Sequence, residues 1–176
     1  MIRAGGTKTT RSLFHPQANI MSSIEELIQQ SAFKNPYQRA LISLIFSTNI
    51  LNTKHHDFLK DYDISPQQFN ILRILRGQYP KPATVNLIRE RMLDKNSDVS
   101  RIVERLRKAN LVERITCEHD RRAVDIVITQ KGLAVLEAID AAQGMEGKAL
   151  TVFSKTEIAQ LNTLLDKLIN HLSENS

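Results

Sequence analysis

The chain has 176 residues, of which 41% are hydrophobic and 24% are charged. This composition can bury a core and excludes a wholly disordered chain, while the single cysteine excludes a disulfide framework or a cysteine-rich zinc site. The net charge is +5, and residues 81–122 hold eleven basic and seven acidic side chains. A basic segment in an otherwise balanced chain is typical of a surface that meets nucleic acid, although a solvated charged face has the same composition. With no apolar run near the roughly 18 residues of a membrane span, we expect a soluble, helix-rich, cytoplasmic protein.

The first third of the chain is predicted to be a tail followed by helices. Residues 1–21 show no periodic pattern, and we expect a flexible tail there. Ser23 and Glu26 have capping-box spacing, and Asn35 before a proline predicts the start of a long helix. That helix carries an apolar seam with alternating spacings of four and three residues, at Tyr37, Leu41, Leu44, Thr48, Leu51, His55, Phe58 and Tyr62. We expect dimerisation helices over residues 22–62.

Residues 63–130 have the pattern of short helices followed by a hairpin. Ser65 and Gln68 predict a helix start, Gly77 is placed to end that helix, and a short helix is expected over residues 84–93. After a polar turn, the next helix has an apolar stripe at Val99, Ile102, Val103 and Leu106. Two β-rich runs, 112–117 and 123–129, enclose a charged tip and predict a β-hairpin.

Residues 131–176 return to helical spacing. Ser154 and Glu157 predict the start of a last helix. Its apolar stripe consists of Ile158, Leu161, Leu165, Leu168 and Leu172. Neither this stripe nor the first seam, which includes Leu41 and Leu44, can be buried within so small a central domain. Pairing with a second copy across a two-fold axis would bury both, so we expect a homodimer built on these two groups of dimerisation helices.

Two short helices joined by a polar turn and followed by a hairpin predict a winged helix-turn-helix. Polar side chains crowd the first turns of the second helix, opposite its apolar stripe: Asn96, Ser97, Asp98, Ser100 and Arg101. Recognition helices present these turns to the base edges of the major groove, where Ser and Arg donate hydrogen bonds to purines. Arg105, Arg107 and Lys108 continue the positive surface. The order of these elements, more than any one of them, favours binding to double-stranded DNA.

Several short segments of the chain carry a resemblance to a known family. They are SPQQFNIL at residues 65–72, SDVSRIVERL at 97–106, LVER at 111–114, and DRR at 120–122 followed by ITQKG at 128–132. Residues 65–132 resemble the DNA-binding core of the MarR family, whose most specific mark is the D-x-R tip with L-T-x-x-G after it; Ile128 stands where Leu is usual. The resemblance implies a mainly α fold, with a winged helix-turn-helix flanked by long dimerisation helices. It further implies a homodimeric regulator, more often a repressor, on a pseudo-palindromic operator, relieved by a small aromatic or anionic ligand.

The residues expected to meet DNA fall on the recognition helix and the hairpin tip. They are Ser97, Asp98, Ser100, Arg101, Arg105, Arg121 and Arg122. Ser97, Ser100 and Arg101 are predicted to read bases, Arg122 to enter the minor groove, and Arg121 to contact phosphate or take the place of Arg122. Asp120 is expected to structure the wing by accepting hydrogen bonds from backbone or from an arginine such as Arg105.

Other chemistries have weaker support. His55, His56 and Asp57 are adjacent on a helix and therefore point in different directions, which disfavours a metal site or a general base. Cys117 lies near arginines that would lower its pKa, so a redox-responsive regulator is an alternative, although peroxide-sensing members of the resembled family carry their cysteine elsewhere. A helical adaptor that binds another protein, without DNA, is a further alternative. We expect no enzyme, no cofactor and no metal; DNA retardation that weakens steeply with salt would separate the alternatives.

Overall fold

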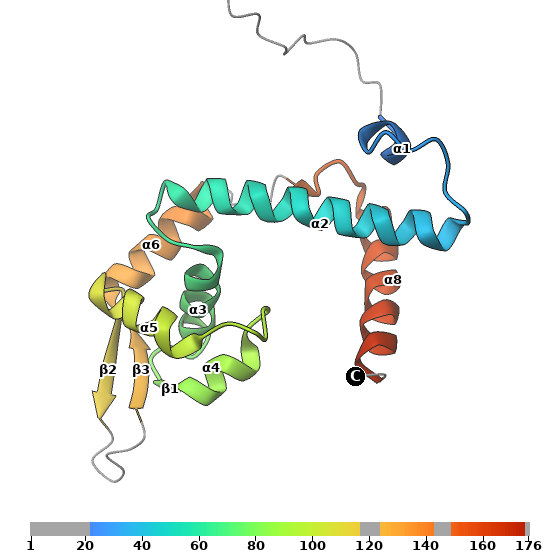
Figure 1. The fold of residues 1–176 in the computed structure, drawn as a ribbon. Coiled ribbons are helices and arrows are strands. Elements are labelled where there is room, and N and C mark those ends of the chain that lie inside the picture. Colours follow the sequence, from blue (N-terminus) through green and yellow to red (C-terminus); the bar gives the residue numbers. More distant parts are fainter. Residues whose placement is uncertain (1–21, 117–123, 143–148, 175–176) are drawn as a thin grey trace, which may run out of the picture. The chain divides into compact units, whose positions relative to one another are not determined.

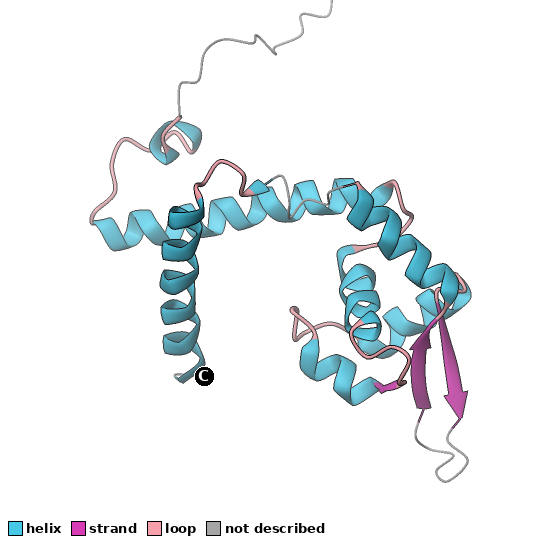
Figure 2. Ribbon diagram, turned by 180° about the vertical axis from the view of Figure 1, so that it is seen from behind, coloured by secondary structure: helices cyan, strands magenta, loops and turns pink. Residues whose placement is uncertain are grey.

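The computed structural model describes residues 22–116, 124–142 and 149–174 (Figure 1). The chain forms two compact units that divide within helix α2, between Phe46 and Ser47. Most of the described residues are helical, and the strands form one small sheet in the second unit (Figure 2). Among the described residues, no helix has both the length and the apolar character needed to cross a membrane.

The described part of the first unit holds α1 (Ile24–Leu27) and the first half of α2 (Pro36–Lys60). The Ser23 hydroxyl accepts the Glu26 N–H at 3.3 Å, which confirms the predicted helix start. An ion pair links the two helices, because Arg39 Nε donates to Glu25 Oε1 at 2.7 Å. Few of the described side chains of this unit are buried, and Ile24 is the buried residue of α1.

The second unit contains the predicted helix-turn-helix and hairpin. Its elements, after the end of α2, are α3 (Pro66–Arg76), β1 (Ala83–Thr84), α4 (Val85–Arg91), α5 (Val99–Lys108), β2 (Val112–Thr116), β3 (Val124–Ile128), α6 (Gln130–Ala141) and α8 (Lys155–Glu174). The three strands form an antiparallel sheet in the order β1-β3-β2, with both Ala83 and Arg114 opposite Ile126. Strand β1 was not predicted, because two residues are too short for a periodic signal.

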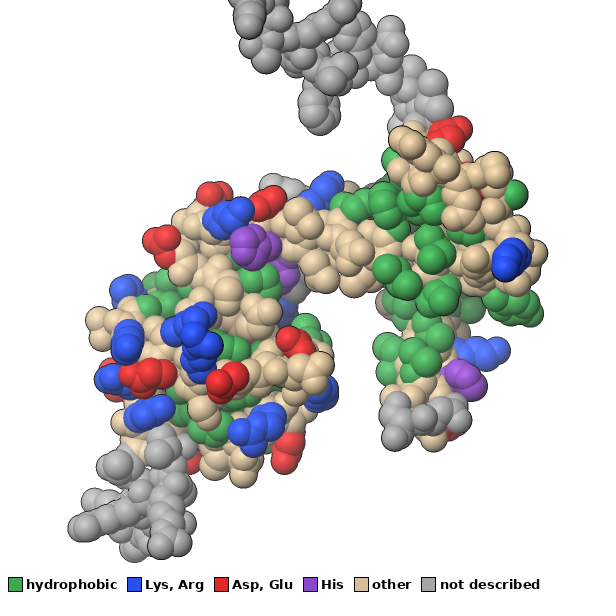
Figure 3. All heavy atoms as spheres, viewed as in Figure 1, with side chains coloured by type: hydrophobic (Ala, Val, Ile, Leu, Met, Phe, Trp, Pro, Cys, Tyr) green, Lys and Arg blue, Asp and Glu red, His purple; other side chains and the backbone are tan. Residues whose placement is uncertain are grey.

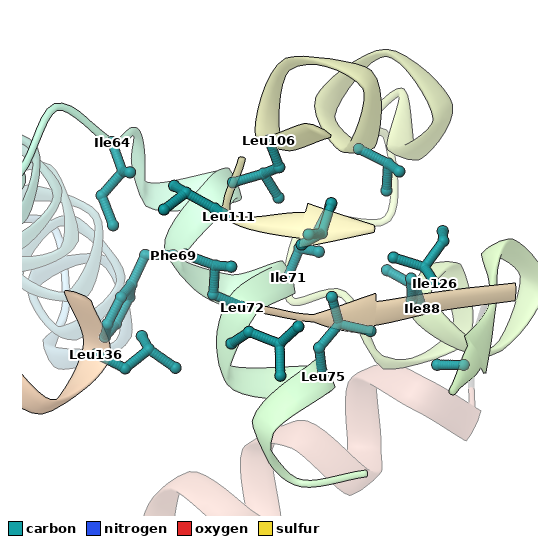
Figure 4. Packing of buried hydrophobic residues seen from close by; sticks show 14 of the residues in the cluster. Ile64, Phe69, Ile71, Leu72, Leu75, Ile88, Leu106, Leu111, Ile126 and Leu136 are labelled. Atoms are coloured by element: carbon teal, nitrogen blue, oxygen red, sulfur yellow. The ribbon is translucent and has the colours of Figure 1, made fainter. Parts of the chain in front are cut away.

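A single apolar core holds these short elements together (Figure 4). It is made of Ile71, Leu72 and Leu75 of α3, Ile88 of α4, Val99, Val103 and Leu106 of α5, Ile126 of β3, and Leu136 of α6, all nearly inaccessible to solvent. The predicted α5 stripe is therefore confirmed as a buried face, with Ile102 partly buried at its side. This packing fixes α5 with its opposite, polar face outward.

Some predicted boundaries are wrong. The short helix expected over 84–93 spans only Val85–Arg91, because Thr84 is its N-cap and Met92 leaves it with extended backbone. The second β-run was expected to include Thr129, whose hydroxyl instead caps α6 by accepting the Gly132 N–H at 3.0 Å. The ends of the two runs at Cys117 and Ala123 lie outside the described residues.

The predicted helix starts at Ser65 and Ser154 are confirmed. Ser65 and Gln68 form both bonds of a capping box, and Ser154 and Glu157 do the same at the start of α8. Gly77 ends α3 as predicted, but with a right-handed φ of −66°, so this position does not require the conformational freedom of glycine.

Helix α8 forms as predicted but buries none of its residues. Its apolar side chains are visible at the surface in Figure 3. Leu168 and Leu172 of the predicted stripe are exposed, while Ile158, Leu161 and Leu165 are half-buried.

Candidate nucleic-acid interface

The turn before α5 is held by side chains on both sides of it. Asn70 Oδ1 of α3 accepts the Leu93 N–H at 2.9 Å, where the chain leaves α4. Asp94 then accepts the Asn96 N–H at 3.0 Å and the Ser97 hydroxyl at 3.0 Å. These bonds fix the chain that leads into α5, so the first turn of α5 has a defined position relative to α3.

Asp98 has a structural role that sequence reasoning did not assign. Its Oδ1 accepts the Arg101 N–H at 3.1 Å, which makes it the N-cap of α5. A carboxylate at this end also interacts favourably with the positive end of the helix dipole. A contact between Asp98 and DNA stays a prediction, and the capping bond engages one of its two oxygens.

The predicted base-reading face is exposed. Ser100, Arg101 and Arg105 point away from the core, and Ser97 is half-buried in the turn. Within the described parts of the chain, neither Arg101 nor Arg105 forms an ion pair with an acidic side chain. Figure 3 shows basic side chains spread over the body that carries α5, with acidic side chains among them. This surface can attract a polyanion.

A second cluster joins α5 to the wing. Arg107 holds Glu104 in a fork, with Nε donating to Oε2 at 3.1 Å and Nη2 donating to Oε1 at 2.8 Å. Arg114 of β2 brings its Nη2 to 3.6 Å from the same carboxylate. The hydrogen bonds from Arg107 lower the pKa of Glu104, and the charge of Arg114 acts in the same direction. Glu104 and Arg114 were not among the predicted site residues, because their meeting depends on how β2 packs beside α5.

The wing itself is present as the β2–β3 hairpin, with Val112 opposite Ile128 and Thr116 opposite Val124. The predicted tip residues, namely Asp120, Arg121 and Arg122, lie outside the described residues, as does Cys117. Their roles in DNA binding, wing structure and redox sensing stay predictions.

The two adjacent histidines of α2, His55 and His56, have different surroundings. The His55 ring packs edge-on against Phe69, with 5.4 Å between ring centroids. The Arg73 guanidinium carbon lies over the Phe69 ring, 5.7 Å from its centroid. His56 is exposed, with Nδ1 3.8 Å from Asp57 Oδ1. The described residues contain no group of three or more side chains that could hold a metal ion. His55 therefore packs as part of the fold rather than converging with His56 on a site.

Comparison with known proteins identifies this arrangement. Residues 62–123 match the family model described as the MarR family. The HTH-type transcriptional regulator PecS of Dickeya dadantii (strain 3937) is 30% identical over 116 residues, which are 65% of this chain and 70% of PecS. The chain belongs to the MarR family. The predicted resemblance is thus confirmed, and the chain is a DNA-binding transcriptional regulator of that family.

Solved MarR-type structures share the fold. That of AbsC from Streptomyces coelicolor has a TM-score of 0.69 at 19% identity and covers 82% of this chain and 99% of its own. That of Staphylococcus aureus MepR in complex with DNA has a TM-score of 0.65 at 23% identity and covers 80% and 99%. The predicted mainly α, winged helix-turn-helix architecture of this MarR-family chain is confirmed. The relatives are regulators rather than enzymes, which supports a non-enzymatic role.

Proposed function

We propose that this MarR-family protein is a homodimeric repressor that binds a pseudo-palindromic operator and releases it when a small ligand binds. The observation that carries the proposal is the exposed N-terminal half of α5. This half presents the exposed Ser100 and Arg101 on a helix that is held in place by an anchored turn and a buried stripe. A helix of this kind fits the major groove with its first turns toward the bases.

The base-reading roles follow from side-chain chemistry. A guanidinium can donate two hydrogen bonds to the O6 and N7 atoms of one guanine, and such a contact contributes about 1–3 kcal/mol of discrimination. Arg101 has the exposure for this contact, and Ser97 and Ser100 add shorter donors beside it. MepR, which shares the fold, was solved bound to DNA, and this supports the same use of the fold here.

Uncovered apolar side chains support the homodimer. In the first unit Leu41 is 57% exposed and Leu44 is 40% exposed, and on α8 Leu172 is 58% exposed. Exposed apolar faces of this kind mark protein interfaces. We assign residues 22–62 and 131–176 to dimerisation and residues 63–130 to DNA binding. A two-fold axis would then place two α5 helices about 34 Å apart, one turn of DNA.

Regulation by a ligand requires two spacings of the α5 helices. A small aromatic or anionic effector would have to bind the spacing that does not fit DNA more tightly than the one that does. By linkage, DNA binding would weaken the effector by the same factor. This part of the proposal rests on the family to which the chain belongs.

Selection of DNA by the full chain tests the proposal. Sequencing of fragments retained from a random duplex pool should yield a pseudo-palindrome, and light scattering should give the mass of a dimer. Binding should weaken steeply with salt, because phosphate contacts release counterions. Arg101→Ala should relax the preference at one position in each half-site. A pool without enrichment would favour the adaptor alternative, and binding abolished by oxidation of Cys117 would favour a redox-responsive regulator.

A further inference from the structure

Glu104 is an unexpected residue on the outer face of α5. It follows Arg101 by three positions and precedes Lys108 by four, so these three side chains share one face of the helix. Under the proposed function, this face meets a polyanion. A lone carboxylate there would repel phosphate and reduce affinity. The structure shows instead a carboxylate enclosed by positive charge.

Two elements supply that charge. Arg107 of α5 binds both oxygens of Glu104, and Arg114 comes from strand β2. The Glu104 side chain is 32% exposed, while those of Arg107 and Arg114 are 48% and 43% exposed. A guanidinium has five N–H donors, and Arg107 uses two of them on Glu104. Both arginines therefore keep donors that can reach a partner in solution.

The position of this cluster in the fold indicates which partner these donors would contact. If α5 lies in the major groove and the wing in the adjacent minor groove, one sugar–phosphate strand must pass between them, because a single strand separates neighbouring grooves. In that arrangement, a cluster that joins α5 to β2, the first strand of the wing, would lie beside this strand. Arginine suits this place, since its planar donors match the geometry of a phosphate.

We propose that Glu104 is a positioning residue that holds Arg107 and Arg114 together for contact with the DNA phosphates between the two grooves. The inference rests on the proposed function. A pre-ordered pair of guanidinium groups loses less side-chain entropy on binding than two mobile arginines. The lowered pKa of Glu104 agrees with a carboxylate that stays charged beside them.

This role predicts an effect opposite in sign to that of simple charge. If Glu104 only repels DNA, its neutralisation must tighten binding. If it positions the arginines, Glu104→Ala must weaken binding by about three- to tenfold and lower the salt slope toward that of Arg114→Ala, which is expected to lose about one phosphate contact. Glu104→Gln, which keeps the shape and an acceptor oxygen, should fall between the wild type and Glu104→Ala.

The experiment measures operator affinity by fluorescence anisotropy over a series of salt concentrations. The probe is the duplex selected with the wild-type chain, and the variants are Glu104→Ala, Glu104→Gln, Arg114→Ala and the double variant Glu104→Ala/Arg114→Ala. Glu113→Gln is the matched control, because it removes the same charge from an exposed position on β2 next to Arg114. Thermal unfolding verifies that each variant folds. If Glu104→Ala does not fold, the affinity of Glu104→Gln tests the inference.

Support requires that both Glu104 variants bind more weakly, that Glu113→Gln does not, and that the double variant binds no worse than Arg114→Ala. Unchanged or tighter binding by Glu104→Gln would overturn the inference. Weaker binding with an unchanged salt slope and an altered base at one operator position would also overturn it, since Glu104 would then read a cytosine directly. If the wild-type chain selects no operator, the proposed function itself fails, which is a separate and visible result.

Discussion

Helices α5 and α8 carry the same kind of apolar pattern and have opposite surroundings. Val99, Val103 and Leu106 of α5 are at most 1% exposed, because α3, α4 and the sheet cover them. Helix α8 has the same spacing of three and four, yet none of its residues is buried within the chain. Periodicity thus indicates that a helix has an apolar face, and it leaves open whether the covering surface belongs to the same chain.

The difference predicts two kinds of response to substitution. Leu106→Ala removes a fully buried side chain from the core, and it should lower the free energy of unfolding by about 2–5 kcal/mol. The loss should appear at every protein concentration, because the cavity lies inside one chain. Denaturant unfolding at two concentrations of protein measures it. A loss below about 1 kcal/mol, close to the effect of a substitution at the surface, would mean that α5 is not part of a tight core.

On α8 the effect should appear in association instead. Leu168→Glu places a charge on the exposed stripe, and it should weaken self-association by about 100-fold or more because an unpaired charge would be buried at the interface. Light scattering should show the mass moving from dimer to monomer over a concentration series. Gln160→Glu is the control, since it adds the same charge to an exposed position of α8 off the stripe. A dimer mass retained by Leu168→Glu would exclude this stripe from the interface.

The same contrast explains how far the sequence could be interpreted. The helix starts at Ser65 and Ser154 were predictable, because a capping box lies within four consecutive residues. The bond from Leu93 to Asn70 crosses 23 positions, and no local pattern indicates it.

The site divides in the same way. The polar face of α5 could be predicted, since helical spacing alone separates it from the buried stripe. The meeting of Glu104 with Arg114 could not, because it depends on the packing of a strand beside a helix. The sequence carried a signal for the capping role of Asp98, because an Asp directly before the first apolar residue of a helix, here Val99, is a typical N-cap. Its interpretation as part of the DNA-binding face left that signal unused.

A substitution at Gly132 tests how closely the start of α6 packs against Leu111 and Ile128. A Cβ at this position would collide with the Leu111 carbonyl oxygen and lie 2.7 Å from Ile128 Cγ1. The Leu111 carbonyl also accepts the Thr129 N–H at 3.1 Å, so it cannot move without loss of that bond. We expect Gly132→Ala to destabilise the fold by about 1–3 kcal/mol, measured by thermal or denaturant unfolding.

Gly77 provides the matched control for that substitution. Its backbone is right-handed, and a Cβ there would meet nothing nearer than the Ile74 carbonyl oxygen at 3.5 Å. Gly77→Ala should be neutral or slightly stabilising, because alanine restricts the unfolded chain without strain in the folded one. Equal effects of the two substitutions would show that close packing at Gly132 does not limit stability.

The smallest expected effect concerns the first unit, where a surface ion pair links α1 to α2 and few of the described side chains are buried. The hydrogen bond from Arg39 lowers the pKa of Glu25 below its usual value near 4.5. A carboxyl group whose pKa is lower in the folded state stabilises that state above its unfolded pKa, and the contribution disappears as the pH falls through the folded pKa. We therefore expect the ion pair to hold α1 at neutral pH and to release it as the pH falls through the lowered pKa of Glu25. An NMR titration of the Glu25 carboxyl should give a pKa under 4.5, and Arg39→Gln should return it to the usual range.

Because both side chains are exposed, amide-exchange protection of α1 should decrease only slightly in Arg39→Gln at pH 7, and it should match that of the wild type once Glu25 is protonated. A Glu25 pKa that does not respond to Arg39→Gln would show that this ion pair does not hold α1 on α2.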